Sequence, residues 1–100
     1  MICMAILAIF TGKGFSKEKY EALRPEVNWE HDKPVGGVFH AASFDEEDNI
    51  HVADVWESEE AMNNFVQSRL MPAFQKLNIP QPSVDIYGVE TWTGTINRSL

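Results

Sequence analysis

The sequence is poor in cysteine, in basic residues and in long apolar runs. Cys3 is the single cysteine in 100 residues, so the chain forms neither an internal disulfide nor a cysteine-rich zinc site. Eight Lys and Arg residues stand against fifteen Asp and Glu residues, which gives a net charge of −7. Because phosphate binding depends on cationic side chains, neither nucleic acid nor an anionic membrane is an expected partner.

The apolar run at residues 2–10 is too short to cross a bilayer, and no basic segment precedes it. We interpret it as a buried strand with an inert Cys3, and we expect a cytoplasmic protein. Residues 1–100 are expected to form one domain, since 100 residues are too few for two cores.

Strand and helix patterns follow one another in the order β-α-β-β-α-β. Apolar or alternating segments predict strands at residues 2–10, 38–44, 50–57 and 83–92. Ser16 and Ser58 are expected to cap two helices, the first kinked or broken near Arg24 and the second bent at Pro72. A loop at residues 28–35 and an acidic turn at 45–49 complete the order.

This order is that of the ferredoxin-like fold, an α+β architecture. Its four-stranded antiparallel sheet carries both helices on one face. The first strand has little polar alternation, so its other side also needs cover. We therefore predict a homodimer in which the free sheet faces of two copies meet.

One segment resembles a known family. Residues 54–65, Asp-Val-Trp-Glu-Ser-Glu-Glu-Ala-Met-Asn-Asn-Phe, are similar to the strand-to-helix junction of the dimeric α/β-barrel superfamily. That superfamily includes antibiotic-biosynthesis-monooxygenase-like domains and haem-degrading monooxygenases. Its junction commonly reads Trp-x-Ser-x-x-Ala-Phe-x-x-Phe/Trp, and here Trp56, Ser58 and Phe65 match it. The resemblance implies a dimeric α/β barrel with a cavity between sheet and helices.

Two departures from the family pattern argue against haem degradation. Haem-degrading members carry an asparagine on the first strand, and residues 2–10 contain none. They also carry a haem-ligating histidine ten residues beyond the tryptophan, where this chain has Val66. We therefore expect no cofactor, which agrees with the similar cofactor-independent oxygenases.

Strand alternation singles out a histidine and an aspartate. If Phe44 pairs with Ile50, His40 lies opposite Asp54 on one face of the sheet. An imidazole beside a carboxylate is a candidate catalytic base with its orienting partner. The alternative interpretation is a buried polar pair that fixes the strand register, and a one-residue slip would separate the two side chains.

Other side chains are candidates for the wall of a ligand cavity. Trp56 is either a ligand wall or core beneath the second helix, and Arg69 either anchors an oxyanion or extends to water. Trp29 and His31 are candidates for a lid. The full set of predicted ligand-binding residues is Val38, Phe44, Trp56, Phe65, Arg69, Leu70, Phe74 and Tyr87.

Metal sites are not expected. A calcium loop that began at Asp45 would need a glycine at Ile50 and a glutamate at Trp56. No His, Asp and Glu cluster has the spacing of a zinc site.

These observations leave more than one function open. The first hypothesis is a homodimer that binds an apolar small molecule, either fatty-acid-like or a polyketide-like aromatic, and acts as a cofactor-independent monooxygenase. The second is a non-catalytic, stress-associated or structural protein with the same barrel. A regulatory sensor domain is the third, disfavoured because the chain carries no appended domain. An open cavity that reaches His40 would favour the first hypothesis.

Overall fold

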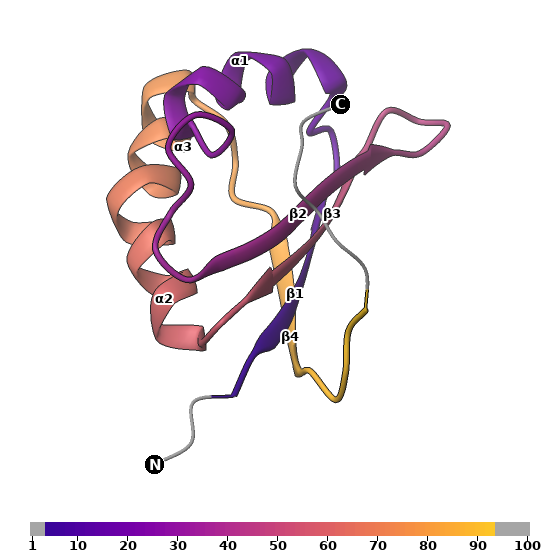
Figure 1. Cartoon of the computed structure of the whole chain (residues 1–100). Helices are drawn as coiled ribbons and strands as arrows, with labels where there is room; N and C mark the ends of the chain where they lie inside the picture. The colour runs from indigo at the N-terminus through magenta and orange to yellow at the C-terminus, as the bar shows by residue number, and fades with distance from the viewer. Residues whose placement is uncertain (1–3, 94–100) are drawn as a thin grey trace.

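The apolar N-terminal run forms a central strand of an antiparallel sheet. The computed structural model describes residues 4–93. Within them, the four strands lie in the order β2-β3-β1-β4, with bounds β1 (Ile6–Gly12), β2 (Gly37–Phe44), β3 (Ile50–Trp56) and β4 (Ser83–Gly88). All three strand pairs are antiparallel, as the ribbon in Figure 1 shows. The expected ferredoxin-like fold is confirmed.

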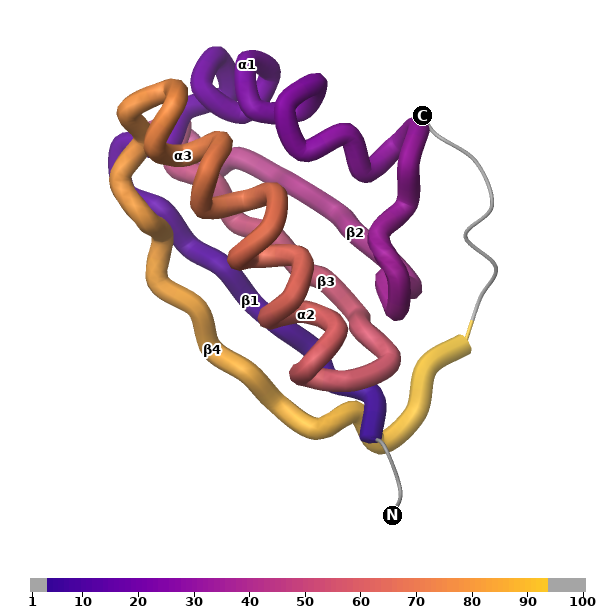
Figure 2. Tube along the Cα trace, turned by 90° about the vertical axis from the view of Figure 1, so that its left-hand side faces the viewer, coloured from indigo at the N-terminus to yellow at the C-terminus, as the bar shows by residue number. Residues whose placement is uncertain are grey.

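Two helical segments cover the same face of this sheet (Figure 2). The first is α1 (Lys17–Val27), and the second consists of α2 (Glu59–Phe65), the π-helical turn η1 (Val66–Leu70) and α3 (Met71–Leu77). The hydroxyl oxygens of Ser16 and Ser58 accept hydrogen bonds from amides in the first turns of α1 and α2. Both predicted caps are therefore confirmed, and they determine where each helix begins.

Pro25 does not break the first helix at Arg24. Helix α1 continues past the proline to Val27 and ends at Asn28, whose φ of 55° is left-handed. Pro25 lies in the last turn, so the amide that it lacks interrupts the hydrogen-bond ladder where the helix is already ending.

Pro72 changes the winding of the second helical segment. A proline at this position cannot donate to the carbonyl of Ser68, four residues earlier. The chain widens into η1, in which the amide of Met71 donates to the carbonyl of Val66. Such a wide turn takes up one residue more than an α-helical turn.

Three strands end at places that differ from the prediction, and β3 does so by one residue, at Trp56. Strand β1 continues beyond Phe10 because Thr11 and Gly12 still pair with β3. Strand β4 ends at Gly88 rather than Trp92, since its pairing with β1 stops there. Cys3 and the first residues of the predicted first strand lie outside the described residues.

The pairing of β2 with β3 has the register inferred from the sequence. Phe44 lies opposite Ile50, and His40 lies opposite Asp54. The register shifts between Gly37 and Phe39, where β2 bulges. A bulge interrupts the strict alternation of side chains, so Val38 does not share the regular pattern that places His40 on the helix-covered face.

The core lies between the sheet and the helices. The helix-facing side of β3 contributes Ile50, Val52, Asp54 and Trp56, all of which are buried. Phe65 and Phe74 cover them from the second helical segment. The opposite side of the sheet carries half-buried apolar side chains, among them Leu7, Ile9, Phe39 and Val55.

The acidic turn between β2 and β3 is held together by one carboxylate. Asp45 accepts hydrogen bonds from the amides of Glu47 and Asn49, at 2.9 and 3.0 Å, and it pairs with the Nε2 atom of His51 at 2.9 Å. These contacts lower the pKa of Asp45 to about 2, with the His51 hydrogen bond as the largest cause.

We predict that a carbon NMR titration of Asp45 has a midpoint of about 2. Because folding lowers this pKa, the carboxylate stabilises the fold above its ordinary value of 3.8, and that contribution is lost as the pH falls through about 2. His51→Ala should raise the midpoint, whereas Glu46→Gln in the same turn should leave it in place. An unchanged midpoint in His51→Ala would contradict the assigned cause.

Candidate functional site

A small cavity lies between the sheet and the helices and opens to solvent. Its volume is about 70 Å³, which is room for a few water molecules. Apolar and aromatic side chains form most of its wall, and its polar lining residues are Tyr20, Arg24, Glu30, His40 and Asp54. A mostly apolar pocket with a few convergent polar groups is the usual form of a small-molecule site.

His40 and Asp54 form the polar centre of the cavity wall. They come from the paired positions of β2 and β3, and the His40 Nδ1 atom lies 2.7 Å from the Asp54 Oδ1 atom. The Asp54 side chain is 5% exposed and the His40 side chain is 25% exposed. The carboxylate is therefore buried behind the imidazole, and the imidazole reaches the cavity.

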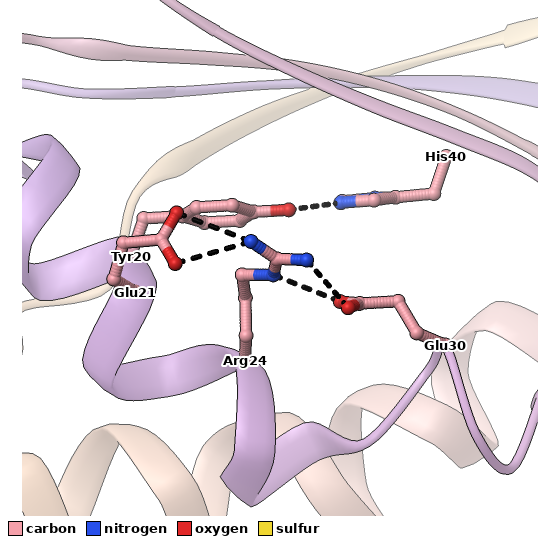
Figure 3. Close-up of polar contacts among 5 residues, drawn as sticks. All are labelled: Tyr20, Glu21, Arg24, Glu30 and His40. Atoms are coloured by element: carbon pink, nitrogen blue, oxygen red, sulfur yellow. Dashed lines mark hydrogen bonds and ion pairs between the residues drawn. The ribbon is translucent and has the colours of Figure 1, made fainter. Parts of the chain in front are cut away.

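Tyr20 completes a chain of three polar groups. Its hydroxyl oxygen lies 2.8 Å from the Nε2 atom of His40, as the close-up in Figure 3 shows. Burial raises the pKa of Tyr20 to about 12, so the hydroxyl keeps its proton at neutral pH. In the tautomer with the ring hydrogen on Nδ1, that hydrogen is donated to Asp54 and Nε2 accepts the hydrogen bond of the Tyr20 hydroxyl.

Tyr20 is not among the predicted site residues, because its position fits the apolar stripe of the first helix. A tyrosine on the buried face of a helix places a hydroxyl inside the protein, and that hydroxyl needs a hydrogen-bond partner. The need of a buried tyrosine hydroxyl for a partner could therefore have indicated Tyr20 from the sequence. The sequence could not identify His40 as that partner, because the contact joins a helix to a strand twenty residues away.

Trp29 forms the aromatic side of the site. Its ring centroid lies 5.3 Å from that of His40, 5.0 Å from that of Trp56 and 5.5 Å from that of Phe65. The ring also packs on Gly37, where an added Cβ would lie 3.0 Å from the indole. Of the two predicted lid residues, Trp29 lines the cavity and His31 is exposed beside it.

An ion-pair cluster lies at the side of the cavity wall nearest α1. The Arg24 guanidinium contacts the Glu30 carboxylate at 2.6 Å and the Glu21 carboxylate at 3.1 Å, and Figure 3 shows it between them. The hydrogen bond from Arg24 lowers the pKa of Glu30, and the same contact raises the pKa of Arg24. Both charges therefore persist at neutral pH beside the Tyr20 ring.

The structure brings five of the ten predicted site residues to the cavity. The lining includes His40, Asp54, Phe65, Leu70 and Phe74. Three others lie close to it without lining it. Trp56 is fully buried beneath Trp29 and Phe65, Phe44 packs against Tyr20 with 5.8 Å between ring centroids, and Val38 lies at the bulge of β2.

Arg69 and Tyr87 point elsewhere. The Arg69 guanidinium donates to the carbonyl oxygens of Val27 and Asp32, at 3.1 and 2.6 Å, and reaches the Asp32 carboxylate at 3.3 Å. It therefore holds the loop that carries Trp29. Tyr87 pairs with Leu7 on the opposite side of the sheet, where it is 55% exposed.

The described part of the chain contains no cluster of three or more potential metal ligands. Among the same residues, no helix has the length and apolar character needed to span a bilayer.

No protein-family model matches the sequence, and no curated protein matches it. Solved structures with the same fold are similar at low sequence identity. A candidate antibiotic biosynthesis monooxygenase from Chloroflexus aurantiacus has a TM-score of 0.65 at 14% identity, covering 90% of this chain and 97% of its own. SnoaB, a cofactor-independent oxygenase from Streptomyces nogalater, has a TM-score of 0.60 at 9% identity, covering 92% and 96%.

A protein of unknown function from Nitrosomonas europaea is similar to a comparable degree. It has a TM-score of 0.64 at 14% identity and covers 94% of this chain and 98% of its own. The resemblance to antibiotic-biosynthesis-monooxygenase-like proteins, inferred from the junction at residues 54–65, is thus confirmed at the level of the fold.

We predict that Trp29→Ala lowers the free energy of unfolding by about 2–4 kcal/mol, because it removes the ring that packs on His40, Trp56 and Phe65. Urea denaturation followed by circular dichroism measures the loss. Trp92→Ala is the matched control, since Trp92 is 54% exposed, and should change stability by less than about 0.5 kcal/mol. Equal losses in the two variants would refute the packing role of Trp29.

Proposed function

We propose that this protein is a homodimer that binds an apolar small molecule in the cavity between sheet and helices and oxygenates it without a cofactor. One observation carries the proposal: a buried carboxylate lies against an imidazole that lines a mostly apolar cavity. A base held by a carboxylate in a pocket with few other polar groups is suited to removing an acidic hydrogen from an apolar molecule.

The proposed reaction begins with proton transfer. The pair His40 and Asp54 accepts a proton from an acidic C–H or phenolic O–H of the substrate, and the electron pair stays on the substrate. The anion reacts with O2 to form a carbon-bound peroxide anion, which takes up a proton and becomes a hydroperoxide. Loss of water, with the second hydrogen of the same carbon and the outer oxygen, leaves a carbonyl group, so one oxygen atom enters the product and the other leaves as water. The mostly apolar wall offers the anion few hydrogen-bond donors besides the named polar groups.

The fold comparisons support the proposal at the level of the fold. SnoaB is a cofactor-independent oxygenase, and its fold covers nearly the whole of this chain. At 9% identity the likeness concerns the fold, which serves many functions. The chemistry is therefore argued from His40, Asp54 and the apolar wall.

The size of the cavity sets a condition on the ligand. A volume of about 70 Å³ is well below the ~300–1,000 Å³ of most ligand pockets, and about half of a ~150 Å³ cavity that holds benzene. A polyketide-like aromatic or a fatty-acid-like chain enters only if the segment with Trp29 moves outward. The same small volume favours the alternative function, a non-catalytic stress-associated or structural protein, so ligand binding itself must be measured.

The dimer is proposed from the uncovered side of the sheet. Leu7, Ile9, Phe39 and Val55 lie there, and both helical segments cover the other side. A second copy of this chain offers the same apolar surface, which a two-fold axis brings into contact with the first. Burial of these side chains in the dimer supplies the driving force.

We predict that purified protein consumes O2 with a member of a panel of hydroxylated polycyclic aromatics, and that His40→Ala slows this by at least about 100-fold. Because this change leaves Asp54 without its partner, the rates are compared at a temperature where circular dichroism shows the variant folded. His31→Ala, which alters an exposed histidine nearby, is the control and should retain the rate. Full activity of His40→Ala with such a substrate would refute the proposed base.

We also predict that native mass spectrometry finds a dimer and that Ile9→Lys converts it to a monomer, because a charge then faces the apolar contact. Ala22→Lys places the same charge on the exposed surface of α1 and should leave the dimer intact. Denaturing extraction of the same sample reports any retained small molecule. A monomeric wild-type protein would remove the support for the sheet-to-sheet association.

A further inference from the structure

Both ring nitrogens of His40 are already engaged. Nδ1 lies 2.7 Å from Asp54, and Nε2 lies 2.8 Å from the Tyr20 hydroxyl. When Nδ1 carries the ring hydrogen, the lone pair of Nε2 accepts the hydrogen of the Tyr20 hydroxyl. A ligand reaches Nε2 directly only by displacing the tyrosine hydroxyl.

The position of the Tyr20 ring opposes such a displacement. The ring lies against that of Phe44 with centroids 5.8 Å apart, and it stacks with the His40 ring at an angle of 17° and a centroid distance of 6.1 Å. It also lines the cavity together with His40. A hydroxyl that donates its hydrogen to Nε2 keeps oxygen lone pairs free to accept another hydrogen.

We propose that Tyr20 is the residue that meets the acidic hydrogen of the ligand, and that His40 and Asp54 take up the proton through it. The inference rests on the proposed function and refines its first step. It also specifies the ligand: a compound that presents a phenolic or similarly acidic O–H at the edge of a flat ring, able to lie against the Tyr20 hydroxyl.

The proton balance of this relay is simple. The O–H bond of the ligand breaks, its electron pair stays on the ligand, and its proton joins the Tyr20 oxygen. The original hydroxyl proton of Tyr20 moves to the Nε2 atom of His40. The ring then carries hydrogens on both nitrogens, and Asp54 accepts the hydrogen bond from Nδ1 and stabilises the positive charge.

Because Tyr20 is partly buried, its hydroxyl does not act as a base by ionising on its own. The pKa of Tyr20 is raised to about 12, mainly by desolvation, and the charges that act on the hydroxyl are those of Arg24, Glu30, Asp54 and Glu21. A free phenolate is therefore disfavoured, and the two proton transfers have to occur together. His40 supplies the place to which the tyrosine proton goes.

The relay can be tested with 4-nitrophenol as the probe, because its neutral and ionised forms absorb at different wavelengths. At a pH where the free probe is neutral, we expect wild-type protein to bind it and shift part of the bound probe to the nitrophenolate band. Tyr20→Phe keeps the ring against Phe44 and should lower the ratio of ionised to neutral bound probe about tenfold, which is the effect of one lost hydrogen bond to a charge.

Tyr87→Phe removes the hydroxyl of the exposed tyrosine on β4 and is the matched control, with an expected ratio equal to that of wild type. His40→Gln should lose the nitrophenolate band, since the final proton acceptor is gone. Circular dichroism confirms the fold of each variant.

The possible results separate the relay from the wider proposal. If Tyr20→Phe ionises the bound probe as well as wild type does, the probe contacts His40 directly. This result overturns the relay and leaves the proposed ligand site supported. If Tyr20→Phe binds no probe at any concentration, Tyr20 is a binding residue and the relay is overturned. If the wild-type protein binds the probe only in its neutral form, the relay is overturned as well. No binding by wild type overturns the relay together with the proposed ligand site.

Discussion

The buried carboxylate of Asp54 requires a close polar partner, and the pairing of β2 with β3 provides it. Asp54 is 4% exposed, and an ionised group at such a position costs several kcal/mol unless a close partner compensates it. His40 is that partner, and it reaches Asp54 because β2 and β3 pair in a single register. A slip of one residue would carry the imidazole to the other face of the sheet. The polar pair therefore specifies the register, and the register specifies the polar end of the cavity.

Side chains from three elements of the fold meet at His40. Tyr20 reaches it from α1, Trp29 from the loop that follows α1, and Asp54 from the neighbouring strand. The loop is held in place from the second helical segment, because the Arg69 guanidinium donates to the carbonyl oxygen of Asp32 in the loop and to that of Val27 at the end of α1. The site thus depends on the docking of both helical segments as well as on the sheet.

The sequence was informative wherever a short-range rule applied. Alternation along two strands joined by a short turn predicted that His40 faces Asp54, and serine caps predicted where both helices begin. The order of elements predicted the fold. The sequence patterns did not predict the direction of side chains whose orientation depends on tertiary packing. Tyr20 and Arg69 are both helical, yet the first points at a strand and the second at a loop, and helical spacing does not distinguish these cases. Val38 does not line the cavity, and the bulge of β2 at this position is not visible in the alternation pattern.

The wide turn at Pro72 has a consequence for the helical phase. Phe65 and Phe74 are nine positions apart, and in an uninterrupted α-helix such residues point about 180° away from each other. The extra residue in η1 reduces the angle between the two side chains by about 100°, which is the rotation of one residue about the helix axis. The two rings are then about 80° apart, and both are buried in the same cavity wall. A proline that removes one hydrogen bond thus lets a single helical segment present two phenylalanines to one small space, which a regular helix of the same sequence length could not do.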